Sequence, residues 1–448
     1  MSDRLQSLTA RLLDAATRAG ADAADAIAVD GTSISIDVRM GKLEQAERSE
    51  GIDIGLRVLI GQRQACVSAS DISDSTLTTM AERAVAMARE APEDANIGLA
   101  EPSQLARDWD LATLDLADPD PEPLPQNLED RARRAEAAAL AVEGITKIDA
   151  AAAAYGRRNI HLAASNGFSG GYSRTSHSTS CVAITGDGTG MERDYYGDSR
   201  VHGSDMESPE HIGRIAGERT VARAGARKPP TGSFPVLYDE RVAASLIGHL
   251  LQAVNGTAIA RGSSWLRDAL HGAVLPDTLS IVENPLRPRA SGSRPFDAEG
   301  LPSAPRNIVE NGELRSWTLD LSTSRQLGMT STGNASRGTS APPSPSVGNI
   351  ALTPGTQARD GLIRDMGTGL LVTSMIGSSI NATTGDYSRG ASGFWIENGE
   401  ITYPVNECTI AGNLRDMLRG LVPANDARTH LSRVVPSLLV EGLTLAGS

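Results

Sequence analysis

A single histidine, His249, stands where a metalloprotease could hold a metal ion. It lies in the segment 236–266, VLYDERVAASLIGHLLQAVNGTAIARGSSWL, which predicts a short strand, a helix and a glycine-serine turn. Apolar residues at spacings of three and four put His249 on or beside the apolar stripe of this helix: Val242, Leu246, Leu250 and Ala253. Catalytic zinc is usually held by three protein ligands and a water molecule. His249 alone is therefore an incomplete site.

The ends of the predicted helix carry their own signals. Asp239 is a predicted N-cap, because a short polar side chain can accept hydrogen bonds from first-turn amides. Asn255-Gly256 predicts the end of the helix. The sequence thus predicts a well-bounded helix with one candidate ligand.

The other histidines do not complete a metal site in the sequence. None of them has a partner at HxH or HxxxH spacing: His161, His177, His202, His211, His271 and His430. The sequence gives no reason to expect them to converge in space. We therefore expect no metal site in this chain alone.

Other catalytic chemistries also lack their residues. Cys66 and Cys181 lie in predicted strands and Cys408 near a hairpin end, with no helix N-terminus or histidine to lower a thiol pKa. No GxSxG motif occurs, and GDGTG at 186–190 is a predicted turn because no Lys-Ser or Lys-Thr follows it. Asp297 and Glu299, in FDAEG, are predicted to hold a loop in place.

The helix around His249 resembles the metal-binding helix of the TldD/TldE (PmbA) family, whose catalytic member carries HExxxH. When Gly248-His249 is matched to the second histidine, the first histidine falls on Ala244 and the glutamate on Ser245. Neither residue can bind zinc or act as a general base. The catalytic member also supplies a cysteine near its C-terminus, and the matching segment 426–447 has none. The pattern is similar to the TldE/PmbA branch, which lacks the metal motif.

The resemblance extends over nearly the whole chain. It is carried by segments 39–73, 171–200, 294–338 and 394–414, the second of which contains MERDY at 191–195. Their order and spacing together identify the chain as a member of this family. The FDAEG carboxylates belong to the third of these segments.

The resemblance implies a subunit of a peptidase complex. A TldD-like catalytic partner would form a heterodimer with this chain and supply the base and the zinc or iron, while this chain would hold no cofactor. The active site would lie in an enclosed cavity that admits unfolded or short peptides, for degradation or leader-peptide removal. A homodimer is expected to be possible for the isolated chain.

Two alternatives remain open. The first is a self-sufficient homodimeric metallopeptidase that uses His249 and further ligands not identified in the sequence. The second is a non-enzymatic adaptor that acts on a toxin–antitoxin or gyrase-related partner, since family members have been called modulators of DNA gyrase.

Composition sets bounds on partners and location. The net charge of −13 and the pI of about 5.1 disfavour direct contact with a nucleic acid, which needs clustered Lys and Arg. Three widely spaced cysteines favour a reduced cytoplasmic setting. No signal peptide or membrane span is predicted.

The elements expected around the site predict an α+β fold. The N-terminal domain, 1–228, is predicted as antiparallel sheet and helices: a helix at 5–16, a meander over 33–70, a helix over 73–90 with Met87 on its apolar face, and strands at 148–155, 160–164 and 171–185. Residues 91–126 are predicted to be an exposed connection.

The C-terminal domain, 232–448, is predicted to be mostly β. Asn-Gly turns at 311–312 and 398–399 each predict a hairpin. The segment 328–349 is low in apolar residues and rich in Gly, Ser and Pro, which predicts a loop that is either mobile or lines a groove.

Overall fold

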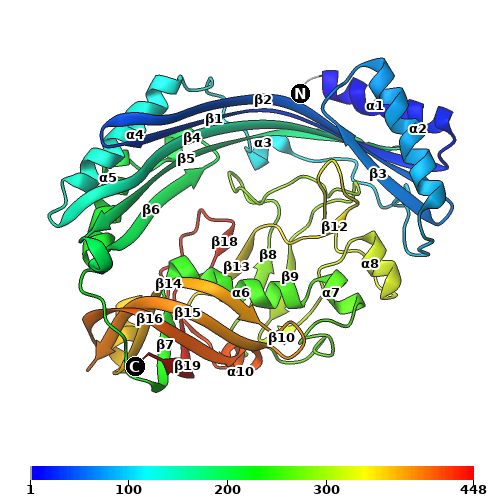
Figure 1. Cartoon of the computed structure of the whole chain (residues 1–448). Coiled ribbons are helices and arrows are strands. Elements are labelled where there is room, and N and C mark those ends of the chain that lie inside the picture. The colour runs from blue at the N-terminus through cyan, green and yellow to red at the C-terminus, as the bar shows by residue number, and fades with distance from the viewer. Residues whose placement is uncertain (1–2, 448) are drawn as a thin grey trace.

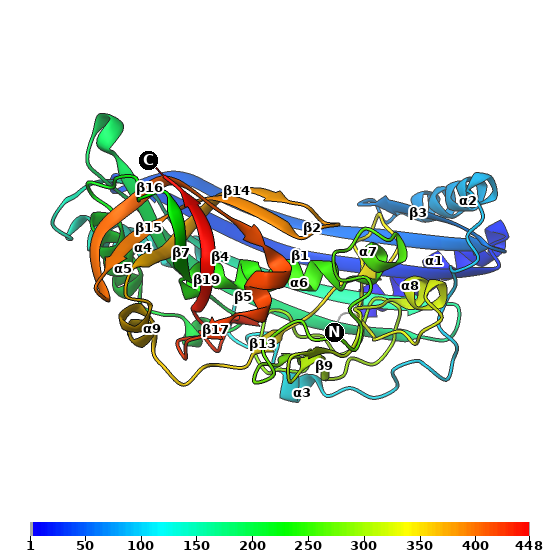
Figure 2. The same ribbon diagram turned by 90° about the horizontal axis from the view of Figure 1, so that it is seen from below.

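The N-terminal half forms an arch over the C-terminal half (Figures 1 and 2) in a computed structural model that describes residues 3–447. The arch is one antiparallel six-stranded sheet with the order β3-β2-β1-β4-β5-β6. Its strands are β1 (Ala23–Arg39), β2 (Lys42–Ile60), β3 (Arg63–Ala69), β4 (Ile145–Ala164), β5 (Ser169–Thr185) and β6 (Glu192–Arg200).

Helices pack on the arch at its two ends (Figure 1). At one end are α1 (Asp3–Ala19) and α2 (Asp74–Glu90), and at the other α4 (Pro125–Leu140) and α5 (Pro209–Val221). Ala24, Ala26 and Ala28 of β1 pack in one core with α1 and α2, whereas Ile27 packs in a core with Phe296 of the C-terminal half. Alternation along the strand therefore gives the sheet an outer face for helices and an inner face for the other half of the molecule.

The middle of the arch has no such core. Residues 49–51 of β2 are exposed where they pair with residues 31–33 of β1, and β3 pairs only with Ile54–Ile60 of β2. The polar stretch Gly156–Asn159 of β4 lies in the same band of the sheet. Two packed ends are thus joined by a thin polar span.

The C-terminal half is built on a second six-stranded sheet, β16-β15-β14-β7-β19-β17, in which β16 also pairs with β19 and closes the sheet on itself. Its strands are β7 (Gly232–Tyr238), β14 (Gly369–Ile380), β15 (Asp386–Glu397), β16 (Glu400–Asn413), β17 (Val422–Pro423) and β19 (Leu438–Ala446). Helix α6 (Glu240–Ala253) packs in the largest hydrophobic cluster together with residues of this sheet.

Smaller elements complete this half. A five-stranded sheet contains β8 (Ile281–Glu283), β9 (Arg306–Glu310), β10 (Glu313–Leu314), β13 (Ile350–Leu352) and β18 (Arg433–Val434), and β11 (Ala335–Ser336) pairs with β12 (Ser344–Pro345). The short helices are α3 (Leu111–Leu114), α7 (Gly256–Ala260), α8 (Leu321–Gln326), α9 (Arg359–Met366) and α10 (Leu414–Arg419), with 3-10 turns at Gly188–Gly190 and Gly203–Asp205.

The structure confirms the α+β fold and both predicted hairpins. Asn311-Gly312 and Asn398-Gly399 have positive φ, as the turn between two short-looped strands requires. Asp239 is the N-cap of α6 as predicted, but Asn255 caps the start of α7 in addition to following α6. The predicted domain division at 228–232 stays a prediction.

Several details of the sequence-based prediction were wrong. Met87 is 43% exposed, and Ala88 takes its place on the buried face of α2. The two strands predicted at 148–155 and 160–164 are one strand, β4, and β6 was not predicted. The connection 91–126 is not wholly exposed, since Ala106 is buried and packs, like Trp109, against residues of both halves.

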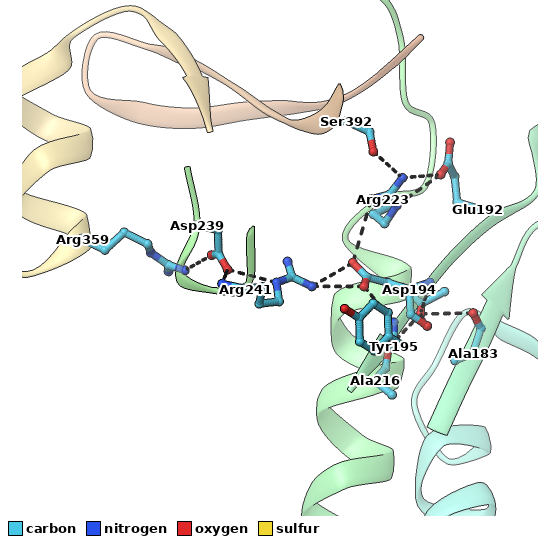
Figure 3. A network of polar contacts seen from close by, with 11 residues as sticks. Ala183, Glu192, Asp194, Tyr195, Ala216, Arg223, Asp239, Arg241, Arg359 and Ser392 are labelled. Atoms are coloured by element: carbon cyan, nitrogen blue, oxygen red, sulfur yellow. Dashed lines mark hydrogen bonds and ion pairs between the residues drawn. The ribbon is translucent and has the colours of Figure 1, made fainter. Parts of the chain in front are cut away.

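Two clusters of buried charges stand out among the polar contacts that join the halves. The linker-side contact, near residues 222–231, contains Glu192, Asp194, Arg223, Asp239 and Arg241 (Figure 3). Arg241 Nη1 donates to Asp194 Oδ1 at 3.1 Å and its Nε to Asp239 Oδ1 at 3.0 Å. Arg223 Nη2 lies 3.2 Å from Glu192 Oε2. The MERDY run therefore supplies two acids to this contact.

The far-side contact lies at the opposite end of the arch, beside α1 and α2. Asp25 of β1 accepts a 2.6 Å hydrogen bond from Arg57 Nε and also binds Arg337 from the C-terminal half. Burial alone would raise the pKa of Asp25, but Arg337 and Arg57 outweigh it and hold the pKa below its usual value. Gly55 of β2 meets Thr339 so closely that a Cβ there would overlap the Thr339 carbonyl.

No helix among residues 3–447 has the length and apolar character needed to cross a lipid bilayer.

Candidate functional site

A cavity of about 640 Å³ separates the middle of the arch from the C-terminal half. The arch contributes polar and small residues of β1, β2, β4 and β5, among them Gly31, Gly51, Arg158 and Arg174. The opposite wall consists of loops at 292–298, 335–339 and 346–348. The volume of the cavity lies within the range of ligand-binding pockets in proteins.

The segment 328–349 forms much of the second wall. It contains only the two-residue strands β11 and β12 and lines the cavity with residues 335–339 and 346–348. Of the two predicted roles for this loop, the structure supports the lining of a groove. Arg337 anchors the loop to the arch through Asp25.

Asp297 and Glu299 hold neighbouring loops, as the sequence predicted. Asp297 Oδ1 accepts hydrogen bonds from the amides of Glu299 and Leu301, both at 2.9 Å, and its Oδ2 accepts one from Ala335 at 3.0 Å. Glu299 Oε2 accepts one from the Leu321 amide at 2.9 Å. Burial raises the pKa of Asp297, and it raises the pKa of Glu299 well above 4.5 with help from neighbouring carboxylates.

An aromatic cluster lies at one side of the cavity, and two of its members, Phe296 and Tyr172, line it. Phe296 packs edge-on against Trp109 at 4.9 Å and against Phe168 at 5.0 Å between ring centroids. Gly170 makes this possible, because a Cβ there would lie 2.8 Å from Trp109 and 2.9 Å from Phe296. Few aromatic residues exist in this chain, and four of them meet here, where Tyr172 joins the other three.

The helix that carries His249 borders a second, smaller cavity of about 280 Å³. Ser245 and His249 line it, one turn apart on α6, together with Arg433 and the loop residues Ser346 and Val347, which also line the larger cavity. Ser245 Oγ donates to the Val242 carbonyl at 2.7 Å. Ala244 packs instead against the hydrophobic core.

His249 lies beside the buried stripe of α6, whose centre is Ala243, Leu246, Ile247, Leu250 and Leu251. Its ring packs edge-on against Tyr387 at 5.9 Å. Burial lowers the pKa of His249, and the positive charge of Arg389 lowers it further. Its Nε2 is buried without a hydrogen-bond partner.

Among the other histidines, the structure brings two together that the sequence did not connect. His177 Nε2 lies 3.1 Å and His202 Nδ1 3.8 Å from the carboxylate of Asp118. Asp118 also accepts hydrogen bonds from the amides of Gly203 and Asp120. Within residues 3–447, no group of three or more His, Cys, Asp or Glu side chains is arranged to hold a metal ion.

The cysteines are packed into the sheets. Burial raises the pKa of the Cys181 thiol to about 12 and that of Cys408 to about 11. Both thiols are therefore protonated near neutral pH.

Comparison with known proteins places this fold and its segments in a family. Models of the first, central and C-terminal domains of PmbA/TldA metallopeptidases match residues 24–88, 115–224 and 231–447. The metalloprotease PmbA of Escherichia coli O157:H7 is 36% identical over 434 residues, which cover 95% of this chain and 92% of that protein. This chain belongs to the PmbA/TldD metallopeptidase family.

Two further relatives agree. A PmbA homologue of Haemophilus influenzae is 37% identical over 447 residues, covering 97% of this chain and 94% of its own. The crystal structure of a protein of Bacteroides thetaiotaomicron, described as a proposed modulator of DNA gyrase, superimposes with a TM-score of 0.92 at 26% identity and full coverage of both chains.

Membership of the PmbA/TldD family implies a metal, and the residues around His249 do not fit one. The smaller cavity offers one imidazole, the Ser245 hydroxyl and the amides of Gln252 and Asn255, with no carboxylate or thiolate. Arg433, from the C-terminal tail, presents a guanidinium there, which cannot donate a lone pair and repels cations. A divalent ion would find one good ligand and a positive charge.

Proposed function

We propose that this chain is a TldE-like subunit of a metallopeptidase complex that processes unfolded peptides, with the metal and the base supplied by a TldD-like partner. The observation that carries the proposal is the environment of α6. The positions matched to the first histidine and the glutamate are Ala244 and Ser245, and the remaining His249 shares the smaller cavity with Arg433. On this proposal the chain contributes walls and surfaces to the enclosed site.

An unpaired strand edge beside the larger cavity supports a role in peptide binding. Residues 42–53 of β2 pair with β1 on one side only, and Ser49, Gly51 and Asp53 from this stretch line the cavity. An extended peptide can add to such an edge through its main chain, which makes recognition largely independent of its sequence. Half of the side chains along the edge are charged, which protects it from aggregation.

The test compares the purified chain alone with its complex. Alone, it should retain no stoichiometric zinc or iron and cleave no unfolded peptide. With a family member that carries HExxxH, it should co-purify and give a peptidase that chelators inactivate. Metal retention by the isolated chain, with peptidase activity lost on chelation, would overturn the proposal in favour of the self-sufficient enzyme.

A substitution separates these alternatives further. His249→Ala should leave the peptidase activity of the complex within about twofold of wild type, because His249 binds no metal on this proposal. His271→Ala, at an exposed histidine in the same half, is the matched control. Loss of activity in His249→Ala alone would point to a catalytic His249. Tight binding of a folded client without any catalytic partner would favour the adaptor.

A further inference from the structure

Two arginines lie directly opposite each other on the inner face of the arch. Arg158 of β4 is paired in register with Arg174 of β5, and both line the larger cavity. Like charges at directly opposed positions of neighbouring strands repel each other and destabilise the pair. The sheet keeps this arrangement in its thin middle span.

Neither arginine has an acidic partner. Within the described part of the chain, no carboxylate lies within 4.0 Å of the guanidinium of Arg158, Arg174 or, on the opposite wall, Arg294. Arg174 donates to the carbonyls of Ser291 and Ser293, both at 2.9 Å, which ties the arch to the facing loop. Among residues 3–447, Arg158 makes neither a side-chain hydrogen bond nor an ion pair.

The acids of the cavity are engaged elsewhere. Asp297 accepts three amide hydrogen bonds, Asp53 accepts one from Ser70 Oγ at 3.0 Å, and Asp30 accepts one from Asn159 Nδ2 at 2.6 Å. Five arginines but only three aspartates line the cavity, so in a chain with a net charge of −13 this lining has an excess of positive charge. Such a local reversal of sign concentrates anions.

The floor of the cavity has room for a main chain. Gly31 lies between Arg158 on β4 and Gly51 on β2, so two adjacent positions have no side chain. A Cβ at Gly31 would lie 2.6 Å from the Arg157 carbonyl oxygen and 3.3 Å from Arg158 Cγ. The glycine therefore leaves the backbone and the stem of Arg158 accessible from the cavity.

We propose that this cavity binds the carboxylate of an unfolded peptide, with Arg158, Arg174 and Arg294 as the recognising groups. Planar guanidinium groups match carboxylate oxygens and form charge-assisted hydrogen bonds with them. The carboxylate comes either from the C-terminus of the peptide or from an Asp or Glu side chain. This inference names the substrate class and rests on the proposed function in assuming a peptide ligand.

The test measures binding to the isolated full-length chain by fluorescence anisotropy. Three labelled, unstructured ten-residue peptides of Gly, Ser and Ala serve as probes: one with a free C-terminus, one amidated, and one amidated with two internal Glu residues. At least one of the carboxylate-bearing peptides should bind at least fivefold more tightly than the neutral one, and which one does so identifies the source. Equal affinity for all three overturns the inference.

Substitutions locate the binding. Arg158→Gln should weaken binding of the preferred peptide about tenfold, the loss expected for one charge-assisted hydrogen bond, and leave the neutral peptide unaffected. Arg83→Gln removes the same charge from an exposed position of α2 and should change affinity less than about twofold. Because the Arg158 side chain makes no hydrogen bond or ion pair with another described residue, the variant should fold, and circular dichroism checks this. Equal affinity of wild type and Arg158→Gln overturns the site.

The outcome is separable from that of the proposed function. Binding is measured without a partner, and peptidase activity only with one. A chain that activates its partner but does not prefer carboxylates refutes this inference alone, whereas a chain that binds carboxylates but forms no peptidase refutes the proposed function alone.

Discussion

The linker-side and far-side contacts both hold the arch to the C-terminal half with buried charges, but they distribute those charges differently. At the linker side, bases and acids alternate in the order Arg359, Asp239, Arg241, Asp194, Arg223 and Glu192 (Figure 3). At the far side, one carboxylate, that of Asp25, serves both Arg57 and Arg337. At the linker side, each of the four inner residues of this series has two partners of opposite charge, whereas at the far side two arginines depend on one carboxylate.

The difference matters because the cavity lies between the two contacts. The chain itself joins the halves at residues 222–231, so the linker side stays together even when an ion pair is lost. The far side has no such covalent link and is held by non-covalent contacts, among them those of Asp25 and Gly55 and the hydrogen bonds from Arg325 to the Asn96 and Leu99 carbonyls. Loss of the far-side contact is therefore the simplest way to separate the walls of the cavity.

The largest effect is expected for Asp25→Ala. The substitution leaves two buried guanidinium groups, with side chains 4% and 0% exposed, without a carboxylate partner. Removal of one partner from a buried ion pair costs about 3–5 kcal/mol of unfolding free energy. Urea unfolding measures the loss, and Asp14→Ala, at an exposed position of α1, should change it by less than about 0.5 kcal/mol. Equal, small losses of unfolding free energy in both variants would show that the far side does not depend on the Asp25 carboxylate.

The same carboxylate gives this contact a dependence on pH. Because the pKa of folded Asp25 lies below its usual 3.8, the stabilisation is present above that value and is lost as the pH falls through the folded pKa. Asp25→Ala should therefore lose its disadvantage relative to wild type in strongly acidic solution.

A smaller loss of unfolding free energy is expected for Asp194→Ala at the linker side. Arg241 keeps Asp239 and Arg223 keeps Glu192, so no buried cation is left unpaired. The expected loss is about 1.5–3 kcal/mol, that of hydrogen bonds to a charged group. In the double variant Asp194→Ala/Asp239→Ala, Arg241 has no acid left, and the loss should exceed the sum of the single losses by at least about 1 kcal/mol. Strict additivity would show that the alternation carries no redundancy.

The close approach at Gly55 offers a milder way to disturb the far side. Gly55→Ala places a methyl group on the Thr339 carbonyl, so the loop must move, at a cost of about 1–2 kcal/mol. Gly51→Ala, four residues away in the same strand, adds a methyl group into open space and should not destabilise the protein. Similar unfolding midpoints for both variants would mean that the loop is not held at Gly55.

Local signals explain what could be predicted from the sequence. The cap at Asp239, the periodicity of α6 and the two Asn-Gly hairpins depend on a few neighbouring residues, and the structure has them all. The linker-side contact could not be predicted in the same way. MERDY was visible as a shared segment, but its pairing with Arg241 depends on how two distant parts of the chain meet.

The candidate cavity produced a misleading signal in the sequence. Gly156–Asn159 interrupts the apolar pattern of β4 and was predicted as a break between strands. The strand continues, and its polar residues lie where the sheet spans the cavity and needs no apolar core. The opposition of Arg158 and Arg174 depends on strand register, which the sequence pattern could not give.

The smallest effect is expected for Glu299→Gln, beside the far-side contact. Burial, Asp297 and Asp320 hold the folded-state pKa of Glu299 well above 4.5, even though Arg57 opposes them. The folded state therefore prefers the protonated side chain, and this stabilisation is complete below pH 4.5 and is lost as the pH rises through the folded pKa.

Glutamine is neutral at every pH and can still accept the Leu321 amide hydrogen bond. Glu299→Gln should therefore raise the unfolding free energy by about 1 kcal/mol at pH 8 and leave it unchanged at pH 4. Unfolding curves at pH 4, 6 and 8 measure the difference, with Glu101→Gln as an exposed control. A loss of stability at pH 8 would instead show that ionised Glu299 shares the two arginines with Asp25, and the far side would then have the second carboxylate that distinguishes the linker side.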